Sequence, residues 1–168
     1  VTRSIVVAIK VHLTPDETRR LGKRPFDNPL AYEYYLRGKD EIDKGTEDAI
    51  KGGMQYLQQA IDIVGDNALI YSGMAWGYWM MVNGGFSQEE GISKAEELAQ
   101  KALNLDPELP EAHALLGWVN SAFLGNQSKA VEHFKKALVI DADNGNALGG
   151  LAVVYGEYLG KETAALSM

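Results

Sequence analysis

The chain has 168 residues, of which 46% are hydrophobic and 23% charged, so it can bury one substantial core and is too apolar for a disordered polypeptide. Its formal charge of −7 and its pI near 5.0 argue against binding to nucleic acid or to an anionic membrane surface, because both would repel it. The absence of cysteine excludes disulfides and thiolate metal sites and fits a reducing compartment, so we expect a cytoplasmic protein.

Residues 1–28 are expected to form a helical lead-in or linker. The segment 4–13 is rich in Ile and Val, which would allow a strand, but Ile5, Ile9 and Leu13 recur at steps of four and favour a helix. Thr14, with Glu17 three residues later, predicts the start of a second short helix. The chain begins at Val1 rather than Met, and we interpret it as a piece of a longer protein.

An internal repeat follows this lead-in. The segment 101–107 returns with small changes as 136–142, a shift of 136 − 101 = 35 residues, and two looser copies precede these. A period of this length is typical of proteins built from stacked helical units. Each copy reads as two helices joined by a short turn.

The third copy shows the helical pattern most clearly. Its first helix is expected to begin after Asp106 and Pro107 and to end near Gly125 and Asn126. Its second helix has one apolar stripe, because small and large apolar residues recur there at steps of three and four. This stripe consists of Ala130, Val131, Phe134, Ala137 and Leu138.

These positions resemble the tetratricopeptide-repeat (TPR) family. Leu116 and Gly117 stand at the family's paired Leu-Gly positions, Phe134 at its aromatic position, and Ala130 and Ala137 at its small-residue positions. The second copy departs from the pattern through an insertion of about eight residues in its turn, around 83–89. The first copy departs through a glycine at position 53, where the family has alanine.

The resemblance implies an all-α fold, a right-handed TPR superhelix or solenoid with about three full repeats and a truncated fourth, preceded by short lead-in helices. It divides the chain into a lead-in (1–28), TPR 1 (29–66), TPR 2 with the inserted turn (67–107), TPR 3 (108–142) and TPR 4 with a truncated second helix (143–168). A turn is then expected around 156–162, and the open end of the fourth repeat predicts self-association or a further repeat.

A narrower resemblance concerns the segments 11–17 and 25–38. They look like the lead-in to the TPR region of bacterial multidomain regulators whose N-terminal domains are similar to adenylate/guanylate cyclase or TolB. This similarity implies that the chain is the regulatory part of a larger bacterial signalling protein. Any cyclase chemistry would then lie outside these residues.

The sequence contains no recognisable catalytic, cofactor or metal motif. His12, His113 and His133 lie far apart and share no ligand spacing, and no serine stands in a GxSxG elbow. The longest apolar stretch, 68–82, would span about 22 Å as a helix, short of the ~30 Å of a bilayer core. We therefore expect neither an enzyme nor a membrane-inserted segment.

The TPR resemblance implies a partner site on the concave face, which the first helix of each pair lines. Carrying the family's groove positions across gives Arg37 and Glu33 in the first repeat, Leu69, Ser72, Trp76, Trp79 and Met80 in the second, and Glu111, Ala114, Trp118, Ser121 and Ala122 in the third. All three tryptophans fall in this set, and tryptophan is enriched at binding hot spots. The alternative is that the indoles pack against the lead-in or the insertion.

The expected function is a protein-interaction scaffold that binds a peptide or protein segment. The groove positions are uncharged at the centre, which favours an apolar or aromatic guest, and the segment 1–13 could be such a guest. A second possibility is a small-molecule sensor, in which the insertion at 83–89 closes a tryptophan-lined cavity and controls an attached cyclase-like domain.

Overall fold

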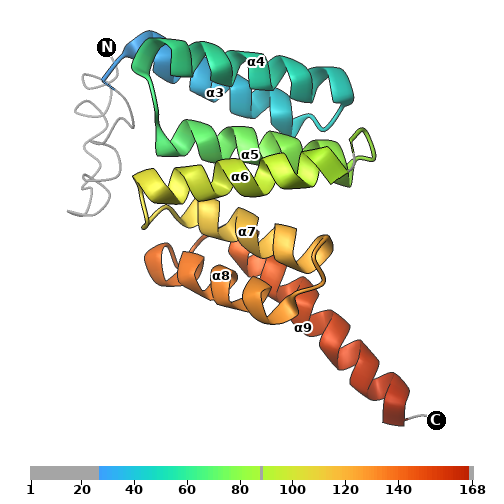
Figure 1. Cartoon of the computed structure of the whole chain (residues 1–168). Coiled ribbons are helices and arrows are strands. Elements are labelled where there is room, and N and C mark those ends of the chain that lie inside the picture. Colours follow the sequence, from blue (N-terminus) through green and yellow to red (C-terminus); the bar gives the residue numbers. More distant parts are fainter. Residues whose placement is uncertain (1–26, 88, 167–168) are drawn as a thin grey trace, which may run out of the picture.

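The computed structural model describes residues 27–87 and 89–166, and residues 1–26 of the expected helical lead-in (1–28) lie outside these ranges. The described residues form seven helices and no strand (Figure 1). The helices are α3 (Pro29–Asp43), α4 (Glu47–Val64), α5 (Ala68–Asn83), α6 (Glu89–Leu105), α7 (Pro110–Ala122), α8 (Gln127–Ile140) and α9 (Gly145–Leu166). Within the same ranges, none of these helices is both long enough and apolar enough to cross a membrane.

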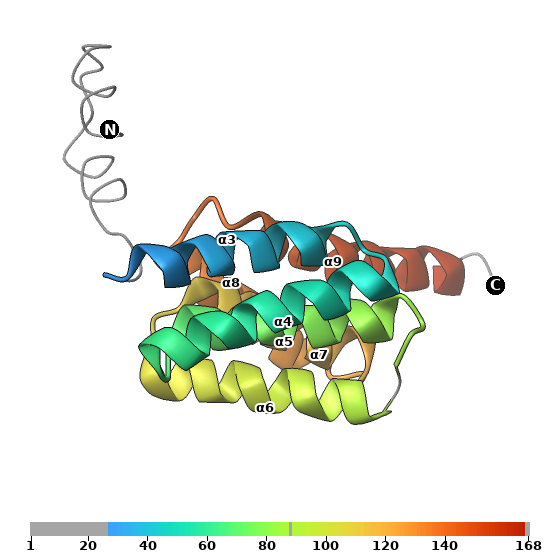
Figure 2. The same cartoon turned by 90° about the horizontal axis from the view of Figure 1, so that it is seen from above.

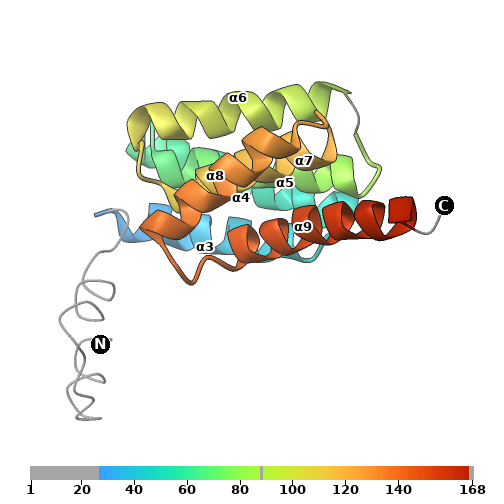
Figure 3. The ribbon, with the colours of Figure 1, turned by 90° about the horizontal axis from the view of Figure 1, so that it is seen from below.

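The helices pack as successive pairs that stack on one another. Helix α3 packs against α4, α5 against α6 and α7 against α8, and neighbouring pairs are in contact (Figure 1). In addition, α5 touches both α3 and α7, and α7 touches α9, so the first helices form one continuous wall. Figures 2 and 3 place α3 and α9 on the side of the stack opposite α6. The arrangement is therefore a curved wall and not a bundle around one central axis.

Asparagine side chains cap the N-termini of several helices. The side-chain oxygens of Asn28, Asn67, Asn126 and Asn144 each accept a hydrogen bond from a backbone N–H in the first turn of α3, α5, α8 and α9. Such a cap satisfies one of the backbone donors that a helix start leaves without an intrahelical partner. These caps fix the first turns of α3, α5, α8 and α9.

Helix α7 begins later than the sequence pattern predicts. The carboxylate of Asp106 accepts a hydrogen bond from the backbone N–H of Glu108, so it caps a turn and not the helix. The helix starts at Pro110, because the fixed φ of proline suits the first helical position and its missing N–H is not needed there.

Glycine and alanine let the helices approach closely. Ala95, Ala99 and Ala102 on α6 are completely buried, as are Ala130 and Ala137 on α8. The fully buried ring of Phe134 lies against Gly117 of α7 and Gly150 of α9, where an added Cβ would stand 2.4 and 2.2 Å from ring atoms. One aromatic side chain thus fixes the spacing of three helices.

Two details of the repeats differ from the expectation. The second repeat is longer mainly because its helices are longer: α5 has 16 residues against 13 in α7, and α6 has 17 against 14 in α8. Helix α9 runs without a turn through Gly156 and Gly160. The position equivalent to the capping Asn126 is Lys161, whose side chain has no acceptor to start a new helix.

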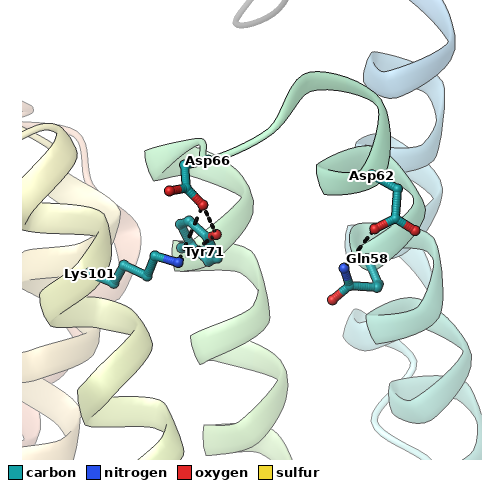
Figure 4. A network of polar contacts seen from close by, with 5 residues as sticks. All are labelled: Gln58, Asp62, Asp66, Tyr71 and Lys101. Atoms are coloured by element: carbon teal, nitrogen blue, oxygen red, sulfur yellow. Dashed lines mark hydrogen bonds and ion pairs between the residues drawn. The ribbon is translucent and has the colours of Figure 1, made fainter.

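A polar contact ties the α4–α5 connection to α6 (Figure 4). The hydroxyl of Tyr71 donates to Asp66, and the ammonium of Lys101 lies 2.7 Å from that hydroxyl and 3.3 Å from the carboxylate. The hydrogen bond from Tyr71 and the charge of Lys101 hold the pKa of Asp66 below its usual value. The first and second repeats are thus linked by these side chains in addition to the covalent backbone.

Candidate functional site

A pocket of about 230 Å³ opens on the wall formed by the first helices of the repeats. It takes residues from four helices that are far apart in the sequence. The lining consists of Tyr35, Lys39, Ile42 and Asp43 from α3, Leu69, Ser72, Gly73 and Trp76 from α5, Glu111 and Leu115 from α7, and Asn146 from α9.

Three equivalent repeat positions meet in this pocket. Leu69, Glu111 and Asn146 each stand in the first turn of α5, α7 and α9, two residues after the capping position of that helix. The repeat therefore places the same position of successive units along one side of the pocket. Leu69, Glu111, Ser72 and Trp76, all expected from the sequence, do line it.

Helix α3 presents a different face from the one expected. The predicted Arg37 is exposed and forms an ion pair with Glu33 at 2.6 Å, and neither residue lines the pocket. Tyr35, Lys39 and Ile42, spaced at four and three residues, line it instead. The first repeat matches the family pattern too poorly for its register to be read from the sequence.

The three tryptophans form one chain of ring contacts, in which Trp76 and Trp79 are stacked and Trp118 is tilted against Trp79. The rings of Trp76 and Trp79 lie 4.7 Å apart and nearly parallel, and Trp118 lies 5.7 Å from Trp79. Trp79 is only 8% exposed and belongs to the core, whereas Trp76 and Trp118 are half-buried. The indole N–H of Trp118 donates to the carbonyl of Asn146, which ties α7 to α9 beside the pocket. Of the three, Trp76 alone lines the pocket.

The other predicted groove residues lie outside the pocket. Ala114 is 1% exposed and packs in the core around Phe134, and the half-buried Met80 packs against the cores of both the first and the second repeat. The hydroxyl of Ser121 donates to the side chain of Gln127 at 3.0 Å. A role of these residues in partner binding stays a prediction.

The pocket is more charged than the sequence indicates. Lys39, Asp43 and Glu111 line it, and the ammonium of Lys39 lies 5.7 Å from the centre of the Tyr35 ring. Burial, with a smaller contribution from the negative charge of Glu111, raises the pKa of Tyr35 well above its usual range. Lys39 and Asp43 were missed because they lie on the unexpected face of α3.

His113 and His133 meet between α7 and α8, although they are 20 residues apart. Their Nδ1 atoms are 3.3 Å apart, and Nε2 of His113 lies 3.1 Å from the carbonyl of Pro107. A carbonyl only accepts, so His113 carries its proton on Nε2 and His133 donates from Nδ1. Burial lowers the pKa of both imidazoles, and the neighbouring His113 lowers that of His133 further.

This pair predicts a loss of stability in mild acid. Both folded-state pKa values lie below the ordinary value near 6.5, so the unfolded chain binds more protons as the pH falls below about 6.5. The free energy of unfolding should therefore be highest above that pH and decrease as the pH falls toward the folded-state pKa values. Melting temperatures at pH 7.5 and 5.5 measure the effect, and His133→Gln should reduce the difference. An unchanged difference in that variant would contradict this role of the pair.

Within residues 27–87 and 89–166, no group of three or more His, Cys, Asp or Glu side chains could hold a metal ion. The histidine pair itself is a contact of two side chains between α7 and α8. It lies outside the pocket.

No protein-family model matches the chain. Among curated proteins, it is 33% identical over 88 residues to the transcriptional regulator HilA of Salmonella typhimurium. The match covers 52% of this chain and 16% of the length of HilA, so the chain spans only a small part of that relative.

Solved structures show the fold. The TPR domain of Sgt2 from Aspergillus fumigatus superimposes with a TM-score of 0.63 at 17% identity, covering 85% of this chain and 88% of that domain. The second TPR of Spaghetti (RPAP3), bound to the HSP90 peptide SRMEEVD, superimposes with a TM-score of 0.53 at 22% identity, covering 67% and 94%. The chain therefore has the fold of a TPR domain, a right-handed superhelix of stacked helix pairs, as its repeat pattern predicts.

Proposed function

We propose that this chain is a protein-interaction scaffold that binds a peptide or protein segment on its concave face, at the pocket beside Trp76. One observation carries the proposal: each of the four first helices contributes to a single pocket that contains a half-buried indole. Half-buried tryptophans in pockets are frequent centres of binding energy. The peptide bound to the similarly folded second TPR of Spaghetti supports the same use of this fold.

The test uses peptides that are selected from a random library because they bind to the immobilised chain. We expect Trp76→Ala to weaken their binding by ~2 kcal/mol, about 30-fold in Kd, measured by fluorescence polarisation. Because Trp76 also packs on Trp79, a second variant leaves the core intact: Asn146→Phe adds bulk at an exposed position of the pocket. Val139→Ser on α8, at a residue 87% exposed and outside the pocket, is the matched control. Selected peptides that bind both pocket variants as well as the control would contradict the proposal.

The chain also fits a role as the regulatory part of a larger bacterial protein. The similarity to a bacterial transcriptional regulator over 88 residues supports this placement. A cyclase-like or TolB-like neighbouring domain and a cytoplasmic location belong to the same proposal and rest on the sequence patterns alone.

The small-molecule sensor has less support than the scaffold. None of the described residues of the insertion at 83–89 lines the pocket. The volume of about 230 Å³ also lies below the roughly 300–1,000 Å³ typical of pockets for drug-sized ligands. A pocket of this size suits a side chain of a longer guest.

Self-association through α9 stays a prediction. Leu148, Val153 and Tyr155 on this helix are 50, 44 and 47% exposed, so an apolar side is open to contact. Light scattering that gives one monomer mass at all concentrations would exclude it.

A further inference from the structure

The side chains around the pocket carry more negative than positive charge. Two carboxylates, Asp43 and Glu111, line it from opposite sides of α5, on α3 and α7, together with one ammonium group, that of Lys39. The whole chain has a net charge of −7, so its long-range field also attracts cations. The charge of the site therefore suits a basic guest better than an acidic one.

Glu111 carries an oxygen that lacks a donor. Its Oε2 is buried from solvent and has no hydrogen-bond partner among the described residues. A carboxylate oxygen that has lost water without gaining a donor is costly, and a charged N–H donor compensates it most strongly. A donor brought by a guest would satisfy this oxygen once the carboxylate turns it toward the pocket that Glu111 lines.

Trp76 provides the second half of the site. The ring lines the pocket and is held in place by the nearly parallel ring of Trp79 at 4.7 Å. The face of an indole attracts cations, and guanidinium groups stack on it most often. A planar guanidinium can stack on a ring while its N–H groups reach a carboxylate, which an ammonium group cannot do with the same geometry.

We propose that the pocket takes an arginine side chain of the bound peptide, with its guanidinium hydrogen-bonded to Glu111 and packed on Trp76. This inference rests on the proposed function and adds the chemistry of the guest. An arginine side chain takes the place of the apolar guest expected from the sequence, because the groove positions expected from the sequence do not include the charged side chains with which α3 lines the pocket. The pocket volume of about 230 Å³ suits one long side chain.

The test uses three acetylated and amidated heptapeptides of leucine and glycine that differ only at the central residue. This residue is arginine, citrulline or glutamate; citrulline has nearly the shape of arginine but no charge. We expect the arginine peptide to bind about ten-fold more tightly than the citrulline peptide and the glutamate peptide to bind most weakly, as measured by tryptophan fluorescence and NMR titration. Binding of the arginine peptide should weaken as salt is added.

Charge variants of the protein identify the carboxylate. Glu111→Gln should lower the affinity for the arginine peptide about ten-fold. It should change the affinity for the citrulline peptide less than about two-fold. The control Glu96→Gln removes the same charge from an exposed position of α6, a helix that does not line the pocket, and should leave both affinities within about two-fold. Circular dichroism of each variant verifies that it is folded.

The outcomes separate this inference from the proposed function. Equal binding of the arginine and citrulline peptides, with both lost in Trp76→Ala, would overturn the arginine site and leave the peptide-binding groove standing. No binding of the arginine peptide up to about 2 mM would also overturn the arginine site. An equal effect of Glu111→Gln and Glu96→Gln would do the same, because it would reveal attraction to the overall charge.

Discussion

Replacing Phe134 by alanine is expected to lower the free energy of unfolding by about 3–5 kcal/mol, the largest effect of any single change considered for this chain. The ring is completely buried and fills the space between α7, α8 and α9 against Gly117 and Gly150. Because neither glycine has a side chain to fill the gap, the cavity cannot be closed without a shift of a helix. The edge contact between Phe134 and Trp118, at 5.7 Å between ring centres, is lost as well.

Chemical denaturation followed by circular dichroism measures this loss. Val139→Ala on the same helix is the matched control, since that side chain is 87% exposed and its truncation should change stability by no more than about 0.5 kcal/mol. Similar midpoints for the two variants would show that Phe134 is not the centre of packing for the third repeat.

Gly53→Ala should be the second most damaging substitution, although the TPR pattern prefers alanine at this position. A Cβ there would lie 2.5 Å from the carbonyl oxygen of Gly38 and 3.0 Å from the backbone N of Ile42, so α3 would have to move away from α4. The overpacking costs roughly 1–3 kcal/mol and outweighs the gain in helix propensity of about 1 kcal/mol. We expect a net loss of about 1 kcal/mol, seen as a decrease in Tm of roughly 2–4 °C.

Replacing the neighbouring glycine by alanine should change the stability in the opposite direction. A Cβ on Gly52, one residue earlier in α4, would meet nothing within 4 Å, so Gly52→Ala should raise the stability by about 0.5–1 kcal/mol. The two alanine variants have the same composition and differ only in which side of α4 they occupy. Equal shifts in Tm would mean that the close approach of α3 and α4 is absent in solution.

The repeat itself could be predicted from the sequence because its packing positions follow a fixed period. The spacing alone predicts that Ala130, Phe134 and Ala137 share one apolar stripe, and all three are completely buried. Gly53 shows the limit of this reasoning. The repeat pattern identifies its position, but the need for glycine comes from the backbone of α3, a contact that is not local in sequence.

The candidate site was only partly predictable for a similar reason. Leu69, Ser72, Trp76 and Glu111 line the pocket as expected, since their repeats match the family pattern in register. Tyr35, Lys39 and Asp43 were missed because the rotation of α3 depends on its packing against α4 and α5. The missing donor at Glu111 likewise follows from its surroundings in space, which the sequence does not describe.

Every repeat contributes lining residues to the pocket, from α3 to α9. This shared site gives the solenoid an uncommon degree of cooperativity. In such proteins stability is normally a sum of local terms, so that an end unit can fray while the others stay folded. Here detachment of α9 would remove Asn146 and release Trp118, and detachment of α3 would remove a complete side of the cavity. A guest that requires all four walls would therefore slow amide exchange at both ends of the array at once.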